Sequence, residues 1–338
     1  MPVPLRRRAA CCAKSPIHPC QRPNRFATLI LIEPLKTFAV SLIVAIASCG
    51  GESLAPALPD AAQLSAQQSA APRFTGDVAL DGLHWINFRR QQAGLSPLSR
   101  EPALDEAATA HARYQQRNNL VTHDQDHKLS GFSGEQAPDR LLAAGYPLRQ
   151  QAVAEGEIVG ASMQADGFAI ADELLTAIYH RYVILEPVFD QAGAGMASRA
   201  GGYTWLTVNF VASRGDRVRP ELPLVVWPAI GQTAVRTYFF SDQETPDPVP
   251  GQDRVGYPVS VHAPMFSRLR VDRFTISEPK GEPLPVRLLD PAQDTETPNS
   301  AAAIVPIQPL LPGRVYEVRF AGTINTEPIG LQWSFTTQ

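Results

Sequence analysis

The sequence predicts an α+β protein with two parts, the first mainly helical and the second built of short strands. Apolar residues recur at helical spacing in several segments between residues 75 and 182. After residue 220 the pattern changes to short β-like runs interrupted by Pro and Gly, in a chain with 31 prolines and 23 glycines. Helices followed by strands favour α+β layers over a doubly wound sheet, and 338 residues are enough for two domains with their own cores.

The N-terminal region indicates export and lipid attachment. All four cysteines lie in the first 49 residues, and the last of them follows the apolar run 38–47. A run of about ten apolar residues is shorter than the roughly 20 that span a bilayer, but it is typical of a signal peptide. Its end, Ile46-Ala47-Ser48-Cys49, resembles the bacterial lipobox, in which the cysteine is acylated and the chain is cut just before it. We predict a lipoprotein signal peptide at residues 1–48 with lipidation at Cys49; the alternative is an ordinary secretory signal with a chance cysteine.

This signal also predicts a location. Acyl chains on Cys49 would attach the mature protein to a membrane without a transmembrane helix. Gly50 stands where an aspartate retains lipoproteins at the inner membrane of enteric bacteria, which favours the outer membrane of a Gram-negative cell envelope. Residues 1–25 are long for the start of a signal peptide and favour a start codon downstream of Met1. Residues 49–73, rich in Ala, Pro, Gln and Ser, are predicted to form a flexible tether.

Three helices and one strand are predicted in a first domain at residues 74–215. The first helix begins with Thr75 as its N-cap and stops at Gly94. The second follows Pro102, with apolar residues at i, i+3, i+4 and i+7 and acidic residues near its start. The third is predicted as one continuous helix over residues 169–182, and the strand covers residues 203–210.

Residues 220–338 are predicted to form a second, all-β domain. Alternation of apolar and polar residues is clearest near the C-terminus, where Tyr316, Val318 and Phe320 share one strand face. Many short strands separated by turns are typical of an antiparallel sandwich. The phrase beginning at Leu311 and the terminal Trp-Ser-Phe segment resemble bacterial Ig-like domains. The candidate strands are residues 222–227, 235–240, 258–263, 269–276, 286–289, 315–320 and 331–335.

Composition and motifs exclude several functions. The formal net charge of −3 offers no basic field, so no nucleic-acid partner is expected. The chain has no phosphate-binding GxxxxGK[ST], no HExxH, no dinucleotide-binding GxGxxG after a strand and no GxSxG. No cysteine follows Cys49, so the folded part can hold neither a disulfide nor a cysteine-ligated zinc, and it lacks a cysteine nucleophile.

Several short blocks follow one another in a recognisable order between residues 74 and 213. They are Asn87-Phe-Arg-Arg90, Gly94-Leu-Ser-Pro97, Thr122-His123, Gly156-Glu157-Ile158-Val159, Tyr179-His180-Arg181 and Trp205-Leu-Thr-Val208. No block is specific by itself, but together and in this order they resemble the bacterial branch of the CAP (SCP-like) family. The resemblance implies an α-β-α sandwich, followed here by the all-β Ig-like sandwich.

The resemblance also implies a site formed by His123, Glu157 and His180, which would line a cleft. Two imidazoles and a carboxylate can hold a divalent metal or transfer protons near neutral pH. A metal such as zinc would then be bound by His123 and His180. The sequence departs from the family pattern at Ile158, where the family has asparagine, and it identifies no second acid, for which Glu155 and Glu173 are weak candidates. The alternative is a His–Glu hydrogen bond that only supports the fold. His111, on the apolar face of its helix, is expected to be a core histidine.

Three functions remain open from the sequence. The leading one is a cell-envelope lipoprotein whose CAP domain presents this His/Glu-lined cleft to a ligand, either a lipid, a divalent metal or another envelope component. The second is a hydrolase of peptide or cell-wall polymer with Glu157 as its base. The third is a non-enzymatic adhesion or interaction protein that uses the edge strands of the Ig-like domain.

Overall fold

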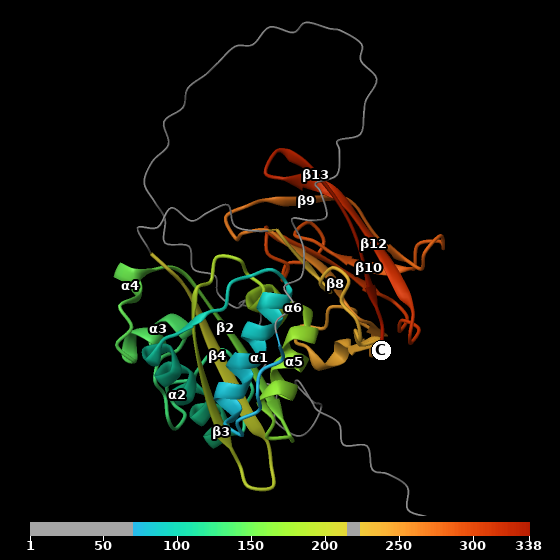
Figure 1. Cartoon of the computed structure of the whole chain (residues 1–338). Coiled ribbons are helices and arrows are strands. Elements are labelled where there is room, and N and C mark those ends of the chain that lie inside the picture. The colour runs from blue at the N-terminus through green and yellow to red at the C-terminus, as the bar shows by residue number, and fades with distance from the viewer. Residues whose placement is uncertain (1–69, 215–223) are drawn as a thin grey trace, which may run out of the picture.

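A computed structural model describes residues 70–214 and 224–338. The predicted signal peptide, Cys49, most of the predicted tether and the junction between the two parts lie outside the described residues. Within the described ranges, no helix is both long and apolar enough to cross a membrane. Figure 1 shows the first part in blue to yellow-green and the second in orange to red.

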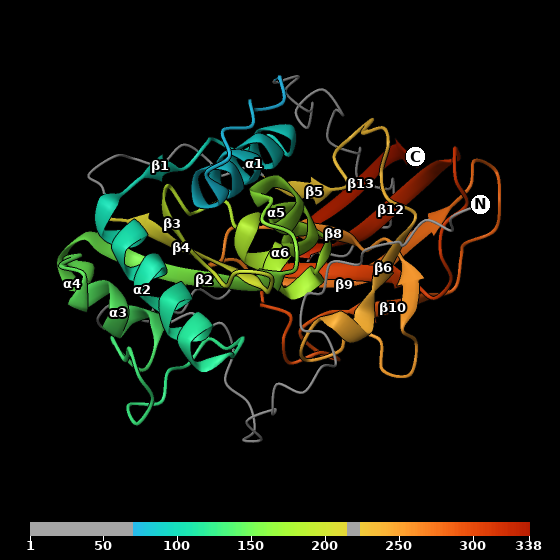
Figure 2. The same ribbon diagram turned by 90° about the horizontal axis from the view of Figure 1, so that it is seen from below.

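The first part is a three-layer α-β-α sandwich, as predicted. Its sheet has the order β1-β3-β4-β2, in which β1 (Ser99–Arg100) runs parallel to β3 (Gln191–Ser198). The other neighbours, β3 with β4 (Thr204–Ser213) and β4 with β2 (Ala152–Ser162), are antiparallel. Figure 2 shows α2 (Pro102–Asn118) on one side of these strands and α1 (Val78–Gln92) and α5 (Gly167–Thr176) on the other. Two short helices, α3 (Ala137–Ala143) and α4 (Leu148–Gln151), lie on the α2 side.

Side chains of β4 alternate between the two helical layers. Leu206, Val208 and Phe210 belong to the core shared with α1 and α5, whereas Trp205 and Val211 pack on the α2 side. On β3, glycine permits the close approach of α2, because a Cβ at Gly195 would lie 2.0 Å from the backbone nitrogen of Thr109. This alternation positions Glu155 and Glu157 of β2 on the α2 side.

The helical boundaries differ from the prediction in two places. Asp77, not Thr75, is the N-cap of α1, because its carboxylate accepts the backbone N–H groups of Ala79 and Leu80. The predicted helix at 169–182 is broken at Ala177, whose backbone is extended (φ −67°, ψ 123°). The second piece is α6 (Ile178–Ile184), which carries His180.

The second part is all-β and antiparallel, as predicted. One sheet has the order β10-β11-β8-β5 and the other β13-β12-β9, and apolar residues of both sheets share one core. The strands are β5 (Val225–Trp227), β8 (Val259–His262), β9 (Leu269–Ser277), β10 (Val286–Leu289), β11 (Ala301–Pro306), β12 (Val315–Ile324) and β13 (Glu327–Thr336). A hairpin of β6 (Tyr238–Phe240) and β7 (Arg254–Gly256) lies beside them. The likeness to Ig-like domains stays a prediction.

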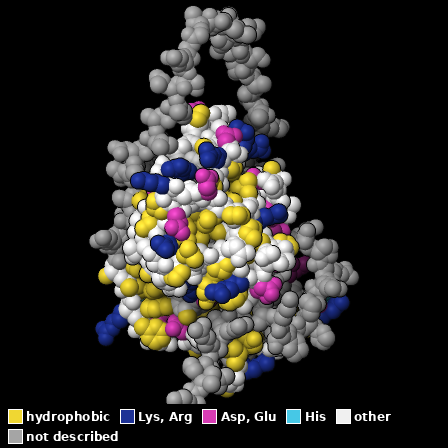
Figure 3. All heavy atoms as spheres, turned by 90° about the vertical axis from the view of Figure 1, so that its right-hand side faces the viewer, with side chains coloured by type: hydrophobic (Ala, Val, Ile, Leu, Met, Phe, Trp, Pro, Cys, Tyr) yellow, Lys and Arg dark blue, Asp and Glu magenta, His cyan; other side chains and the backbone are white. Residues whose placement is uncertain are grey.

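The two parts are joined by an extensive interface and share a core. Val225, Trp227 and Val235 belong to the same apolar cluster as the residues of α1 and α5. Arg236 of the second part bonds Asp172 at 3.0 Å and Glu173 at 2.5 Å, both on α5. Figure 3 views the molecule from the right-hand side of Figure 1, and there charged side chains of both signs are scattered among hydrophobic ones without forming a patch of one sign.

Candidate functional site

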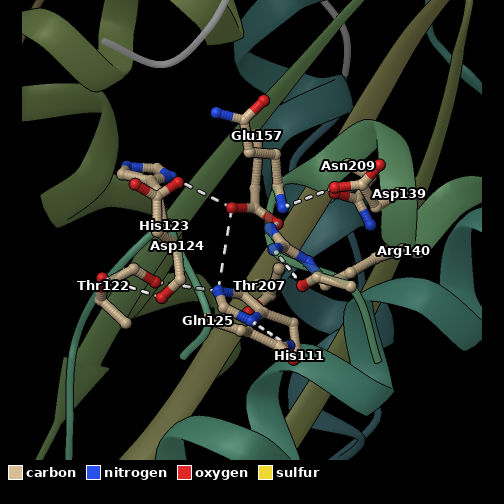
Figure 4. A network of polar contacts seen from close by, with 12 residues as sticks. His111, Thr122, His123, Asp124, Gln125, Asp139, Arg140, Glu157, Thr207 and Asn209 are labelled. Atoms are coloured by element: carbon tan, nitrogen blue, oxygen red, sulfur yellow. Dashed lines mark hydrogen bonds and ion pairs between the residues drawn. The ribbon is translucent and has the colours of Figure 1, made fainter. Parts of the chain in front are cut away.

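Glu157 of β2 lies at the centre of a polar cluster on the α2 side of the sheet (Figure 4). Its side chain is only 3% exposed. One carboxylate oxygen is 3.0 Å from Nδ1 of His123, and the other accepts a hydrogen bond of 2.7 Å from Arg140 of α3. The structure thus brings His123 and Glu157 into direct contact and adds Arg140, which sequence reasoning missed.

The charge of Glu157 is fixed by its neighbours. Burial alone would raise the pKa of this carboxyl group, but the Arg140 guanidinium, together with His111 and His123, holds the pKa well below its ordinary value. Glu157 is therefore an ionised acceptor at neutral pH, so Nδ1 of a neutral His123 donates to it. That arrangement leaves Nε2 of His123 as a hydrogen-bond acceptor, on a ring that is 34% exposed.

His111 of α2 is a core histidine that supports the loop carrying His123, in agreement with the prediction. Its Nε2 donates to the backbone oxygen of Thr122 at 2.8 Å, and its Nδ1 accepts from the Gln125 side-chain amide at 2.8 Å. Burial lowers the pKa of His111 to about 4, so the ring stays neutral. Both ring nitrogens are used within the fold, so His111 positions the site and is not free to bind a ligand.

His180 lies next to His123, but its partner is not Glu157. The ring centroids of His180 and His123 are 6.4 Å apart. Nδ1 of His180 is 3.1 Å from a carboxylate oxygen of Glu244, which lies in the second part of the chain. No sequence signal identified Glu244, because it falls outside every block that resembles the CAP family.

The two weak candidates for a second acid are elsewhere. Glu173 pairs with Arg236 at the interface between the parts. Glu155 is buried near Glu157, and burial, reinforced by the Glu157 charge, raises its pKa to about 8. One oxygen of Glu155 has no hydrogen-bond partner. Glu155 is therefore protonated at neutral pH and lies buried near Glu157.

The predicted zinc site does not fit the donor geometry well. Within residues 70–214 and 224–338, no three His, Cys, Asp or Glu side chains are grouped so that they could hold a metal ion. The carboxylate nearest His123 is already paired with the Arg140 guanidinium, a cation that would repel a metal. Metal binding by His123 and His180 stays a prediction, and no step below depends on it.

Comparison with known proteins agrees with this fold. A model of the cysteine-rich secretory protein (CAP) family matches residues 83–210. The matched residues lie within the α-β-α part, which is therefore similar to a CAP domain. A search of the curated proteins finds no match.

Two solved structures are similar to part of this chain. An extracellular protein containing a SCP domain from Bacillus anthracis str. Ames is 22% identical, with a TM-score of 0.34 over 40% of this chain and 40% of that one. An outer surface protein from Borrelia burgdorferi is 16% identical, with a TM-score of 0.33 over 39% of this chain and 90% of that one. The matched region is thus less than half the length of the Bacillus protein.

Proposed function

We propose that this is an exported cell-envelope lipoprotein whose CAP domain binds a ligand at His123 and His180 without chemical turnover. The observation that carries the proposal is a pair of adjacent, partly exposed imidazoles, each with Nδ1 bonded to a buried carboxylate. When both rings are neutral, both Nε2 atoms are left as hydrogen-bond acceptors. Such a pair suits a ligand with hydrogen-bond donors, such as the hydroxyl or amine groups of a lipid head group or an envelope glycan.

The polar cluster favours binding over hydrolysis. A general base works best when its pKa is near the working pH. The pKa of Glu157 lies far below neutral, and Arg140 and His123 occupy both of its oxygens. Glu157 is thus a support for His123 and a poor base, which argues against the hydrolase alternative.

We expect replacement of both His123 and His180 by alanine to weaken ligand capture. The purified chain would be incubated separately with total envelope lipids and with a digest of peptidoglycan, and bound molecules would be identified by native mass spectrometry. Loss of two hydrogen bonds, at about 1 kcal/mol each, should weaken binding about 30-fold. His127→Ala is the matched control, because His127 is on the same loop but 75% exposed.

Two outcomes would contradict this proposal. Equal retention of the bound molecule by the wild type and the double variant would exclude the imidazole pair as the site. Calorimetry with zinc chloride alone is the second check. Zinc binding by the wild type that disappears in the double variant would assign the imidazoles to a metal instead.

Membrane attachment through Cys49 is a separate part of the proposal and rests on the lipobox-like segment. In cells fed radiolabelled palmitate, the wild-type chain should carry label and fractionate with the membranes. Cys49→Ser should lose both the label and the membrane association, because the thiol is the acyl acceptor. A labelled Cys49→Ser chain, or an unlabelled wild type, would contradict lipidation at this position.

A further inference from the structure

We infer that the second, all-β part of the chain (residues 224–338, called the β domain below) completes the site. Within it, Glu244 is the residue that positions His180. The inference rests on the proposed function, since it concerns the same imidazole pair. It departs from the expectation that the second domain is separate from the first and has a core of its own. Three observations carry it: the contacts of Glu244, the support beneath Glu244, and the burial of α6 against the β domain.

The Glu244 carboxylate is the common acceptor for the start of α6. One oxygen accepts the backbone N–H of Ile178 at 2.8 Å, and the other accepts that of Tyr179 at 2.8 Å. The second oxygen also lies 3.1 Å from Nδ1 of His180. Because α6 begins just after the break at Ala177, these N–H groups lack partners within the helix. One carboxylate therefore fixes both the beginning of the helix and the ring it carries.

Glu244 is itself held in a compact turn of the β domain. It is 2% exposed and follows the 3₁₀ turn η2 (Ser241–Gln243). Its backbone N–H donates to the Ser241 oxygen at 3.1 Å. The hydroxyl of Ser241 bonds the Asp247 carboxylate and accepts the Val249 N–H. The carboxylate thus has little freedom to move away from His180.

The rest of α6 is also held by the β domain. Arg181 donates to the Pro258 oxygen at 2.7 Å, Tyr182 bonds Thr297 at 3.2 Å, and Tyr179 donates to Asp294 at 3.3 Å. Ile178 and Tyr182 pack in a core with Val255 and other β-domain residues. The place of His180 relative to His123 is therefore set by contacts with the second domain as well as with the first.

The contact at Nδ1 has a specific chemical consequence. A carboxylate can only accept, so a neutral His180 must carry its proton on Nδ1 and present Nε2 as an acceptor. His123 has the same arrangement through Glu157. Glu157 comes from the CAP domain and Glu244 from the β domain, so the two domains supply matching halves of the ligand site.

The tautomer of His180 provides the test. In ¹⁵N-labelled full chain, NMR correlations of the neutral rings should show the proton on Nδ1 for both His123 and His180. In Glu244→Ala we expect the His180 signal to move to the mixture of tautomers seen in free histidine, while His123 stays unchanged. Glu244→Gln should restore the Nδ1–H form, because the amide oxygen can accept from His180. Glu282→Ala, an exposed change in the same domain, is the control.

A role limited to capping the helix would change stability but leave the His180 tautomer as it is. An unchanged tautomer in folded Glu244→Ala would therefore overturn the inference. A wild-type His180 with its proton on Nε2 would overturn it as well, and this measurement does not require any variant to fold. Failure of the wild type to bind lipid or glycan would count against the proposed function alone, since the tautomer is read without ligand.

Discussion

Arg181→Leu is expected to lower the free energy of unfolding by about 3–5 kcal/mol, because several buried acceptors would lose their donor at once. The guanidinium is fully buried and donates to the backbone oxygens of Leu175 and Thr176 in the CAP domain. It also donates to the Pro258 oxygen at 2.7 Å, across the interface with the β domain. Leucine fills part of the space but cannot donate to any of these oxygens. Urea unfolding followed by tryptophan fluorescence would measure the change.

Because Arg181 bonds both domains, we expect the two domains to unfold in one shared transition. Loss of Arg181 should move that whole transition to lower urea concentration, and not only the unfolding of the CAP domain. Arg319→Leu is the control, since Arg319 is 58% exposed in a surface ion pair, and it should change the free energy of unfolding by less than about 1 kcal/mol. If the wild type already unfolds in two transitions and Arg181→Leu shifts only the first of them, Arg181 does not couple the domains. A shift as small as that of Arg319→Leu would contradict the prediction directly.

The sequence predicted the two-part α+β architecture because periodic apolar patterns report which face of an element is buried. They do not report what covers that face. The core side chains of α6 follow a helical period, but Ile178 and Tyr182 pack in a cluster with β-domain residues from Phe239 onward. The sequence therefore indicated two separate domains, whereas the structure has a shared core.

Local patterns also failed where tertiary contacts determine the backbone. The break at Ala177 does not interrupt the helical spacing of apolar residues, so the sequence pattern does not show it. The backbone groups that the break exposes are bonded instead by the side chains of Glu244 and Arg181. The strand β11 was not predicted, because Ala301-Ala-Ala-Ile-Val-Pro306 does not alternate. Every residue of that strand is buried, as in a strand covered on both faces.

Only the site residues that lie in short sequence motifs could be predicted. His123 and Glu157 lie in blocks that resemble the CAP family, and the structure joins them by a hydrogen bond. Glu244 could not be found, because its role depends on the docking of a second domain. Arg140 could not be found either, since an arginine on a helix is ordinarily solvated, and its burial depends on its contacts with the Glu157 carboxylate and the Glu135 backbone oxygen.

Arg140→Leu is expected to destabilise the protein by about 3–5 kcal/mol at pH 7, because it leaves the buried Glu157 carboxylate without its main counter-charge. The effect should depend on pH in a defined direction. In the wild type the lowered pKa of Glu157 contributes stability above the ordinary carboxyl value of 4.5, and this contribution is lost as the pH falls through the folded value. Without Arg140, burial favours the protonated acid. The deficit of the variant should therefore be largest near neutral pH and shrink on acidification.

Urea unfolding at pH 7 and at pH 4.5 would measure both parts of this prediction. Arg149→Leu, an exposed arginine on α4, should leave stability nearly unchanged at either pH. In Arg140→Leu/Glu157→Gln the uncompensated charge is gone, so the double variant should be more stable at pH 7 than Arg140→Leu alone. A deficit that is equal at both pH values and persists in the double variant would show that Arg140 stabilises the fold by packing alone. In that case the ionised state of Glu157, and with it the fixed tautomer of His123, would lose its physical basis.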